Sequence, residues 1–217
     1  DTTVPTVSSI AVTGVTSGSY GTAATYVVIV TASETLENEP DLTLEGGTVG
    51  DGVGSVSDTV WTYTFTPTSA DQAVTINVEA GDITDAAGND NTATPTQFAF
   101  THDATVPTMT ITSSTVDSGD TTNDATIALA FTSSESTSNL IEGDITLSGG
   151  TLSNFAGSGA AYTATFTPSA EAATSILIAA DKFTDAAGNQ NSASNTFAWT
   201  YDSTALSITI ASSTSGV

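Results

Sequence analysis

The chain has 217 residues, of which 38% are apolar and only 12% charged, and 24 acidic residues against a single lysine give it a formal charge of −23. It lacks the cations that drive contacts with nucleic acid or an anionic membrane surface, so both are excluded as partners and cations are expected instead. There is no cysteine for a disulfide or Cys-ligated metal, and no apolar run approaches the roughly 18 residues of a membrane span, so this segment is not expected to insert into a membrane.

Short runs in which apolar residues alternate with threonine predict half-buried β-strands. The clearest run is Trp61-Thr-Tyr-Thr-Phe65, whose aromatic side chains share one face while the threonines take the other. We expect these aromatic residues to form a core and not a carbohydrate-stacking platform. The strands predicted in the first hundred residues are 6–13, 23–32, 41–46, 48–57, 60–66, 73–79 and 96–101.

The pattern then repeats. Asp1-Thr-Thr-Val-Pro-Thr6 returns as Asp103-Ala-Thr-Val-Pro-Thr108 and, more weakly, as Asp202-Ser-Thr-Ala-Leu-Ser207. The interval is about 100 residues, the commonest domain size. We therefore predict two domains, 1–102 and 103–201, joined end to end without a Gly/Ser-rich spacer. Residues 202–217 are either the first strand of a third repeat or a strand donated to a neighbour.

Core positions of the two copies correspond pairwise. The expected core of the first copy comprises Tyr26, Val28, Val30, Val74, Ile76, Val78, Phe98 and Phe100, and that of the second Ile127, Leu129, Phe131, Thr174, Ile176, Ile178, Phe197 and Trp199.

Seven antiparallel strands with turn signals every 8–12 residues predict an all-β fold of tandem seven-stranded immunoglobulin-like β-sandwiches. Two further motifs recur: Ser33-Glu34 as Ser134-Glu135, and Thr84-Asp-Ala-Ala-Gly-Asn89 as Thr184-Asp-Ala-Ala-Gly-Asn189. With these motifs the chain resembles, over residues 1–201, the bacterial immunoglobulin-like repeats of large extracellular adhesins and surface proteins. The resemblance implies secretion to an extracellular or cell-surface location, a tandem array, and calcium at or near the linkers.

The number of strands between the chain's entry and each loop, here called strand parity, brings acidic elements together at one end of the unit. In a seven-strand antiparallel unit the loops after the second and sixth strands return to the end at which the chain enters, so three elements converge there. Their all-oxygen donors suit a hard cation, and flexible loops favour Ca²⁺ over Mg²⁺. The alternative is that the aspartates only cap turns and the glutamates are solvated. The predicted ligands are Asp1, Glu34, Asp85 and Asn89 in the first copy and Asp103, Glu135, Asp185 and Asn189 in the second.

The repeats, the tail and the threonine rows suggest three functions, none of them enzymatic. His102 is the only histidine and has no counterpart in the second copy, and acids repeated on a scaffold indicate structure, so catalysis is not expected. The leading interpretation is a spacer with calcium-stiffened joints in an adhesin-like protein. A second is a filament or sheath subunit that binds neighbouring copies of itself through the tail, where Leu206, Ile208 and Ile210 alternate like a first strand. A third is a glycan- or ice-binding module with exposed threonine rows.

Overall fold

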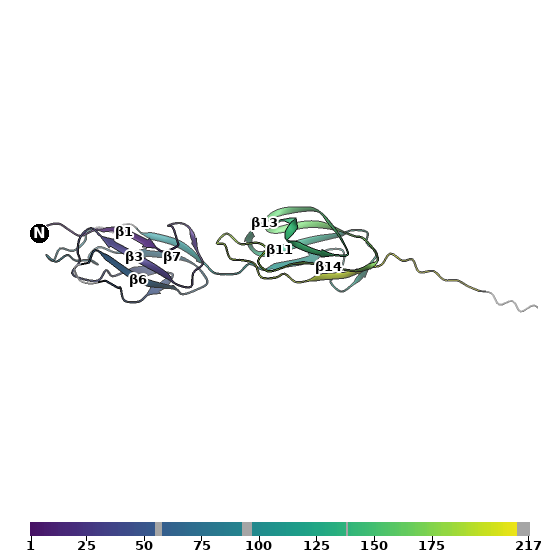
Figure 1. Cartoon of the computed structure of the whole chain (residues 1–217), viewed down its shortest axis with the longest axis horizontal. Coiled ribbons are helices and arrows are strands. Elements are labelled where there is room, and N and C mark those ends of the chain that lie inside the picture. Colours follow the sequence, from purple (N-terminus) through teal and green to yellow (C-terminus); the bar gives the residue numbers. More distant parts are fainter. Residues whose placement is uncertain (55–57, 93–96, 138, 212–217) are drawn as a thin grey trace, which may run out of the picture. The chain divides into compact units, whose positions relative to one another are not determined.

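A computed structural model describes residues 1–54, 58–92, 97–137 and 139–211 of the chain. It divides into two compact units, one formed by Asp1–Val106 with Ala186–Asn189 and the other by Pro107–Asp185 with Gln190–Val217. Each unit consists of two β-sheets (Figure 1). Because side chains alternate between the two faces of a strand, the sequence pattern buries one face of each sheet against the other.

In the first unit, every predicted strand overlaps an observed one. The predicted strand 48–57 is reduced to a short strand and one isolated bridge between Val53 and Thr62, and its residues 55–57, like residue 96 of the last prediction, lie outside the described residues. One sheet has the order β1 (Val7–Val12), β3 (Tyr26–Ala32), β6 (Val60–Pro67) and β5 (Gly47–Val49), and the other β2 (Tyr20–Gly21), β8 (Phe98–Asp103), β7 (Asp71–Asn77) and β4 (Thr43–Glu45).

The prediction of seven antiparallel strands was incomplete, because the first unit contains the additional strand β2. This strand runs parallel to β8, with Tyr20 opposite Thr101 and Gly21 opposite His102. The other pairings between named strands of the described part of this unit are antiparallel, as predicted. Two residues are too few to show an alternating pattern, so the sequence carries no signal for β2.

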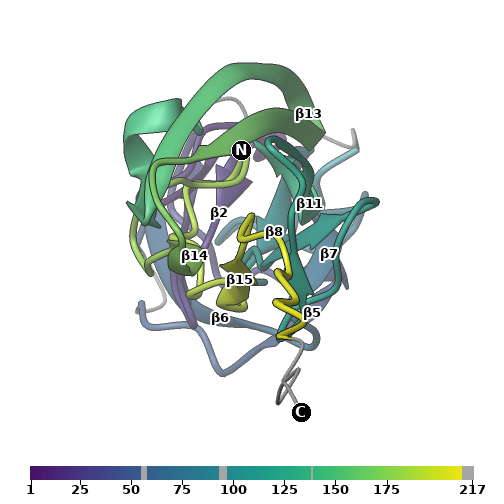
Figure 2. The same cartoon turned by 90° about the vertical axis from the view of Figure 1, so that its right-hand side faces the viewer.

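The second unit has its own pair of sheets. Its 19-residue strand β13 covers the counterparts of two separate strands of the first unit and bends back on itself, so that the ring of Phe155 stacks on that of Tyr162. The broad arch of β13 is visible in Figure 2. One sheet has the order β9 (Met109–Ser113), β11 (Ile127–Thr137) and β13 (Gly150–Pro168), and the other β10 (Thr121–Thr122), β15 (Phe197–Tyr201), β14 (Ala172–Ile178) and β12 (Ile145–Ser148), with a short 3-10 turn at Glu142–Asp144.

The buried residues confirm the predicted alternation of core and surface positions along the strands. All of the core residues predicted for the two copies are buried, and Phe65 and Phe166 are fully buried. Burying a side chain of this size contributes about 1.5–3 kcal/mol to folding. A glycine pair recurs at Gly46-Gly47 and Gly149-Gly150, and its second member makes room for the ring in each unit. A Cβ at Gly47 would lie 2.1 Å from Cζ of Phe65, and one at Gly150 would lie 2.4 Å from Cζ of Phe166.

The single histidine is structural. His102 lies in β8 and is buried, and its Nδ1 is 2.8 Å from Oη of Tyr26 and 3.1 Å from the carbonyl oxygen of Gly21. Its ring also contacts the Tyr26 ring edge to face. His102 therefore joins β2, β3 and β8.

Candidate metal centre

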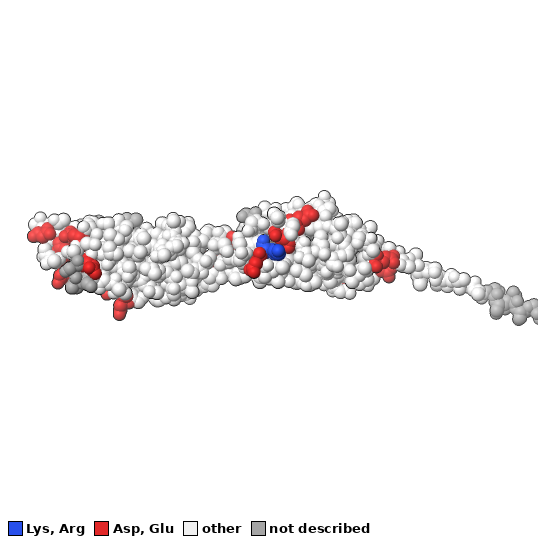
Figure 3. All heavy atoms as spheres, viewed as in Figure 1, with Lys and Arg blue, Asp and Glu red and all other residues white. Residues whose placement is uncertain are grey.

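Three carboxylates of the first unit meet at one end of its sandwich, as strand parity predicts. Asp1, Glu34 and Asp85 each offer an oxygen within 4.8 Å of the others, and the three differ in burial: Asp1 is exposed, Glu34 half-buried and Asp85 buried. They line a hollow of about 270 Å³ together with Thr35, Ala86 and Ala87. In Figure 3 acidic side chains gather at the end of the first unit where the chain begins.

The turn after β7 fixes the carboxylate of Asp85. Its Oδ1 accepts hydrogen bonds from the backbone N–H groups of Ala87 and Asn89, at 2.9 and 2.8 Å, and its Oδ2 accepts one from Nδ2 of Asn89 at 2.8 Å. These bonds, the one from the Asn89 side chain first, hold the pKa of Asp85 below its ordinary value. Gly88 adopts a φ of 86°, which this turn requires. Asp85 is thus a turn-capping residue whose carboxylate stays ionised at neutral pH.

A second asparagine ties the loop that carries Glu34 to the loop that carries Asp85. Oδ1 of Asn38 accepts from the backbone N–H of Thr84 at 2.6 Å, and its Nδ2 donates to the carbonyl oxygen of Asp82 at 3.0 Å. The backbone N–H of Glu37 donates to the Thr84 carbonyl at 2.8 Å. In the second unit, Asn139 likewise accepts from the backbone N–H of Thr184 at 3.0 Å. In each unit, hydrogen bonds therefore hold the two acidic segments together.

One oxygen of this cluster lacks a partner. Oε1 of Glu34 is buried and has no hydrogen-bond partner among the residues that the structure describes, and an oxygen of the Glu34 carboxylate lies within 4.8 Å of an oxygen of Asp1 and of Asp85. Residues 1–106 contain neither lysine nor arginine. A buried carboxylate oxygen without a donor is costly, and three like charges at this separation repel one another. The donors are all oxygens, so a hard cation fits the cluster and would offset both costs.

Asn89 turns its amide nitrogen toward the cluster. Its Nδ2 donates to Asp85, as described above, and lies 3.5 Å from the backbone carbonyl oxygen of Asp1. We therefore give Asn89 a positioning role in the proposal below, where the sequence suggested a ligand.

The counterparts in the second repeat are divided between the two units. Glu135 and Asp185 belong to the second unit, half-buried and buried respectively, whereas Asp103 ends β8 of the first. Glu135 lies within β11 and not in a loop, contrary to expectation, because β11 continues to Thr137 to pair with the long strand β13. Nδ2 of Asn189 donates to the carbonyl oxygen of Asp103 at 3.0 Å. The proposal below therefore rests on the geometry of the first set.

Sequence reasoning missed two asparagines that organise the same loops. Asn91 and Asn191 stand two residues after the Asp-Ala-Ala-Gly-Asn motifs and are buried. Oδ1 of Asn191 accepts from the backbone N–H groups of Lys182 and Phe183, at 2.7 and 2.9 Å, while its Nδ2 donates to the carbonyl of Ala179 at 2.9 Å. The signal was an asparagine at the same place in both copies.

The Asp-x-Thr segment at the three repeat starts, Asp1, Asp103 and Asp202, forms the same turn each time. The backbone N–H of the threonine donates to Oδ1 of the aspartate two residues earlier. The N···O distances are 2.8 Å for Thr3 and Asp1, 3.2 Å for Thr105 and Asp103, and 2.9 Å for Thr204 and Asp202.

An acid at the start of β7 or just before β14 holds this motif where the chain leaves each unit. Oγ1 of Thr105 donates to Oδ2 of Asp71 at 2.5 Å, and Oγ1 of Thr204 donates to Oε2 of Glu171 at 2.6 Å. Oγ of Ser203 donates to the other oxygen of Glu171 at 2.7 Å. We call each threonine–acid pair an exit clasp. These bonds, the threonine hydroxyl first, lower the pKa of both acids.

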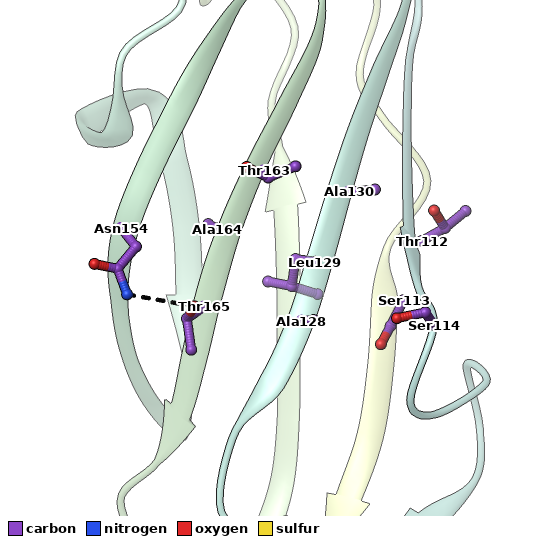
Figure 4. A pocket seen from close by; sticks show the side chains of 10 residues that line it. All are labelled: Thr112, Ser113, Ser114, Ala128, Leu129, Ala130, Asn154, Thr163, Ala164 and Thr165. Atoms are coloured by element: carbon purple, nitrogen blue, oxygen red, sulfur yellow. Dashed lines mark hydrogen bonds between the residues drawn. The ribbon is translucent and has the colours of Figure 1, made fainter.

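A shallow groove of about 470 Å³ crosses the outer face of β9, β11 and β13 (Figure 4). It exists because β11 carries Ala128 and Ala130, where β3 of the first unit carries Val27 and Ile29. Threonines 112, 163 and 165 flank these alanines. The ten lining residues include neither an aromatic ring nor a charged group, so the groove lacks the features that bind sugars by stacking or ion pairing.

Two sandwiches in one chain, each with a buried apolar core and an acid-rich loop cluster, define a tandem β-sandwich module. The bacterial Ig-like domain model matches residues 1–101 and 103–201, and the chain belongs to this family. This confirms the resemblance and the fold class expected from the motifs. In the described part of the chain we find no helix that could span a membrane.

Among solved structures, the chain is similar to two proteins of Yersinia pseudotuberculosis. With the adhesin InvE it shares 13% identity over 89% of this chain and 58% of that one, at a TM-score of 0.33. With InvD it shares 17% identity over 96% of this chain and 65% of that one, at a TM-score of 0.39. A glucan-utilization protein of Bacteroides ovatus, SGBP-B, aligns at 13% identity over 84% of this chain and 42% of that one, at a TM-score of 0.23. The chain thus spans less than two thirds of the length of each. No curated protein sequence matches it.

Proposed function

We propose that this chain is a spacer segment of a long secreted or surface-attached, adhesin-like repeat protein, in which calcium stiffens the joints between Ig-like modules. The observation that carries the calcium part is the buried Oε1 of Glu34, which has no partner among the described residues although the Glu34 carboxylate is clustered with those of Asp1 and Asp85. Family membership over two consecutive repeats supports the modular role. A repeated scaffold with cores packed by side chains supports a structural and not an enzymatic function.

Asp1, Glu34 and Asp85 would hold the ion, and Asn89 would keep Asp85 in place. Asp103, Glu135, Asp185 and Asn189 are the corresponding set of the second repeat. Calcium accepts carboxylate oxygens in flexible geometry, whereas Mg²⁺ demands a near-ideal octahedron, so three carboxylates on separate loops favour calcium. When bound, the ion supplies the positive charge that residues 1–106 lack and links the start of the module to two loops.

The expected stabilisation follows from mass action. Extracellular calcium modules have dissociation constants of about 10⁻⁴ to 10⁻³ M. At a calcium concentration of about 10 mM, each site would therefore gain about 1.4–2.7 kcal/mol of unfolding free energy. A gain of this size raises the melting temperature of a domain of about 100 residues by several degrees, at about 4–8 °C per kcal/mol.

Glu34→Gln is the sharpest test, because this substitution should have opposite effects with and without the ion. In chelator, loss of one of three crowded charges leaves the melting temperature unchanged or raises it. In calcium, the variant loses most of the increase that the parent shows. Glu37→Gln is the matched control, since Glu37 is exposed three residues away and its carboxylate takes no part in the cluster. It should respond to calcium like the parent.

The measurement is thermal melting in calcium, in chelator, and in chelator with sodium chloride at matched ionic strength, together with calorimetric titration of calcium. If sodium restores the melting temperature as fully as calcium, or if Glu34→Gln keeps the whole calcium response, the acids form only a solvated surface. Asp185→Ala tests the second repeat in the same way and should abolish the calcium response of that unit.

The tail supports a second candidate function, self-assembly into a filament or sheath. Leu206, Ile208 and Ile210 are 91, 79 and 89% exposed, and by the repeat alignment the two isoleucines match Met109 and Ile111, which are 3 and 1% exposed in β9. An exposed strand-like apolar segment invites edge pairing with another copy. Deleting residues 203–217 should abolish concentration-dependent association in sedimentation velocity. Oligomers that survive the deletion would exclude strand donation by the tail.

A further inference from the structure

In each unit, an early strand and the last strand lie side by side and run in the same direction. In the first unit, β2 pairs with β8, and the backbone bonds Gly18 N–H to Ala99 O, at 2.7 Å, and Thr101 N–H to Ser19 O, at 3.0 Å, extend the pair. In the second unit, β10 pairs with β15. Bonds of 2.7, 2.8 and 3.0 Å there join Gly119 to Ala198, Thr200 to Asp120 and Asp202 to Thr122.

A serine hydroxyl reinforces each of these patches. Oγ of Ser17 donates to the carbonyl oxygen of Ala99 at 3.3 Å, and Oγ of Ser118 donates to that of Ala198 at 3.2 Å. In the first unit, the buried pair of Tyr26 and His102 also contacts Gly21 of β2. The patches are therefore short but bonded more densely than their two paired residues suggest.

The direction of β8 decides how the β2/β8 patch is strained when the two ends of the first unit are pulled apart. The loop before β8 carries Asn89, which lies against the carbonyl of Asp1, so β8 starts near the end of the unit where the chain enters. β8 then runs to the opposite end, where the chain leaves (Figure 1). Tension at the entry reaches β2 through β1, which pairs with β3, and pulls β2 back toward the entry. Tension at the exit pulls β8 forward along the same axis.

From this geometry we propose that the parallel patches β2/β8 and β10/β15 carry the force when the chain is under mechanical tension and so resist its extension. Strands pulled in opposite directions along their axes strain all of their hydrogen bonds at once. Strands pulled apart from one end break theirs one after another. An amide hydrogen bond contributes little net stability against water, so the simultaneous loading and not the strength of any bond gives the resistance. This inference does not depend on calcium.

The absence of cysteine allows a test in which only the direction of force changes. The full chain is first pulled by its two ends in an optical trap, and then through handles on Ala23→Cys and Ala104→Cys. Both alanines are exposed, and they follow β2 and β8 at the same end of the parallel pair, so these handles unzip the patch. The cysteine variant should keep the thermodynamic stability of the parent, and its melting temperature checks this.

We expect the first unit to yield through the internal handles at about half the force or less than it needs when pulled by the chain ends, because forced unfolding follows the barrier and not the equilibrium stability. Equal forces in the two directions would overturn the proposal.

A substitution tests the second unit independently. Thr200→Pro removes the bond from Thr200 N–H to Asp120 and should lower the end-to-end unfolding force of that unit. Leu147→Ala, on the edge strand β12 outside the patch, is the control and should leave the force close to that of the parent although it destabilises the unit. If the unfolding force of the second unit falls equally in both variants, in proportion to their loss of thermodynamic stability, β10/β15 does not carry the force. If Thr200→Pro does not fold, the comparison of pulling directions in the first unit still decides.

Discussion

Nδ2 of Asn89 donates a 2.8 Å hydrogen bond to Oδ2 of Asp85, across a turn whose backbone N–H groups hold the other carboxylate oxygen. The Asn89 side chain is the first cause of the lowered pKa of Asp85. A lowered pKa in the folded state means that the Asp85 carboxylate stabilises the unit above its unfolded pKa, near 3.9, and that this contribution is lost as the pH falls through the folded value.

We predict that Asn89→Ala raises the pKa of Asp85 toward its ordinary value. Carbon-detected NMR titration of the Asp85 carboxyl in chelator measures the change. The acid unfolding of the first unit should begin at a higher pH in the variant. An unchanged Asp85 titration would show that the backbone N–H groups alone hold the carboxylate.

Asn191→Ala should be the most destabilising single change in the loop between β14 and β15. The substitution leaves the backbone N–H groups of Lys182 and Phe183 without their acceptor, and each orphaned buried group costs about 1–3 kcal/mol. We expect a loss of about 2–4 kcal/mol of unfolding free energy, measured by chemical denaturation. Gln190→Ala, at the exposed neighbouring position, is the control and should stay within about 0.5 kcal/mol of the parent.

The exit clasp of the second unit predicts which of two substitutions raises the pKa of Glu171 more. Thr204 is the first and Ser203 the second cause of the lowered pKa of Glu171. Thr204→Val should therefore raise the Glu171 pKa, and Ser203→Ala should raise it less, as followed by NMR titration. Since the lowered pKa belongs to the closed clasp, the segment after Asp202 should become more mobile in ¹⁵N relaxation once the pH falls below the Glu171 pKa. The reverse ranking of the two variants would contradict the observed geometry.

The two glycines at positions 47 and 50 predict opposite outcomes for the same substitution. A Cβ at Gly47 would lie 2.1 Å from the Phe65 ring, whereas one at Gly50 meets nothing within 4 Å. Gly47→Ala should cost about 1–3 kcal/mol through overpacking. Gly50→Ala should be neutral or stabilise by up to about 1 kcal/mol, because it reduces the freedom of the unfolded chain. Melting temperatures of the two variants check this, and similar values would contradict it.

The alternation of Trp61, Tyr63 and Phe65 was enough to predict β6 and its buried face, because a two-layer fold has to bury one side of each strand. Strand parity likewise placed Glu34 beside Asp85 without any structural information. The parallel strand β2 could not be predicted, because two residues show no period. The role of Asn191 was hidden for another reason: a buried asparagine with several backbone partners has the same sequence appearance as one in a solvated turn.

The exit clasp also determines where one repeat can be cut from the next without breaking a contact. By sequence, Asp103 opens the second repeat, yet Thr105 is bonded to Asp71 of the first unit. A cut before Asp103 separates the two partners of the clasp, whereas a cut after Val106, where the first compact unit ends, keeps them together. Glu171 replaces Asp71 in the second unit and still meets a threonine. An aspartate or a glutamate at this place thus bonds the threonine of the Asp-x-Thr segment that follows, so units that differ in this acid keep the same contact where the chain leaves them.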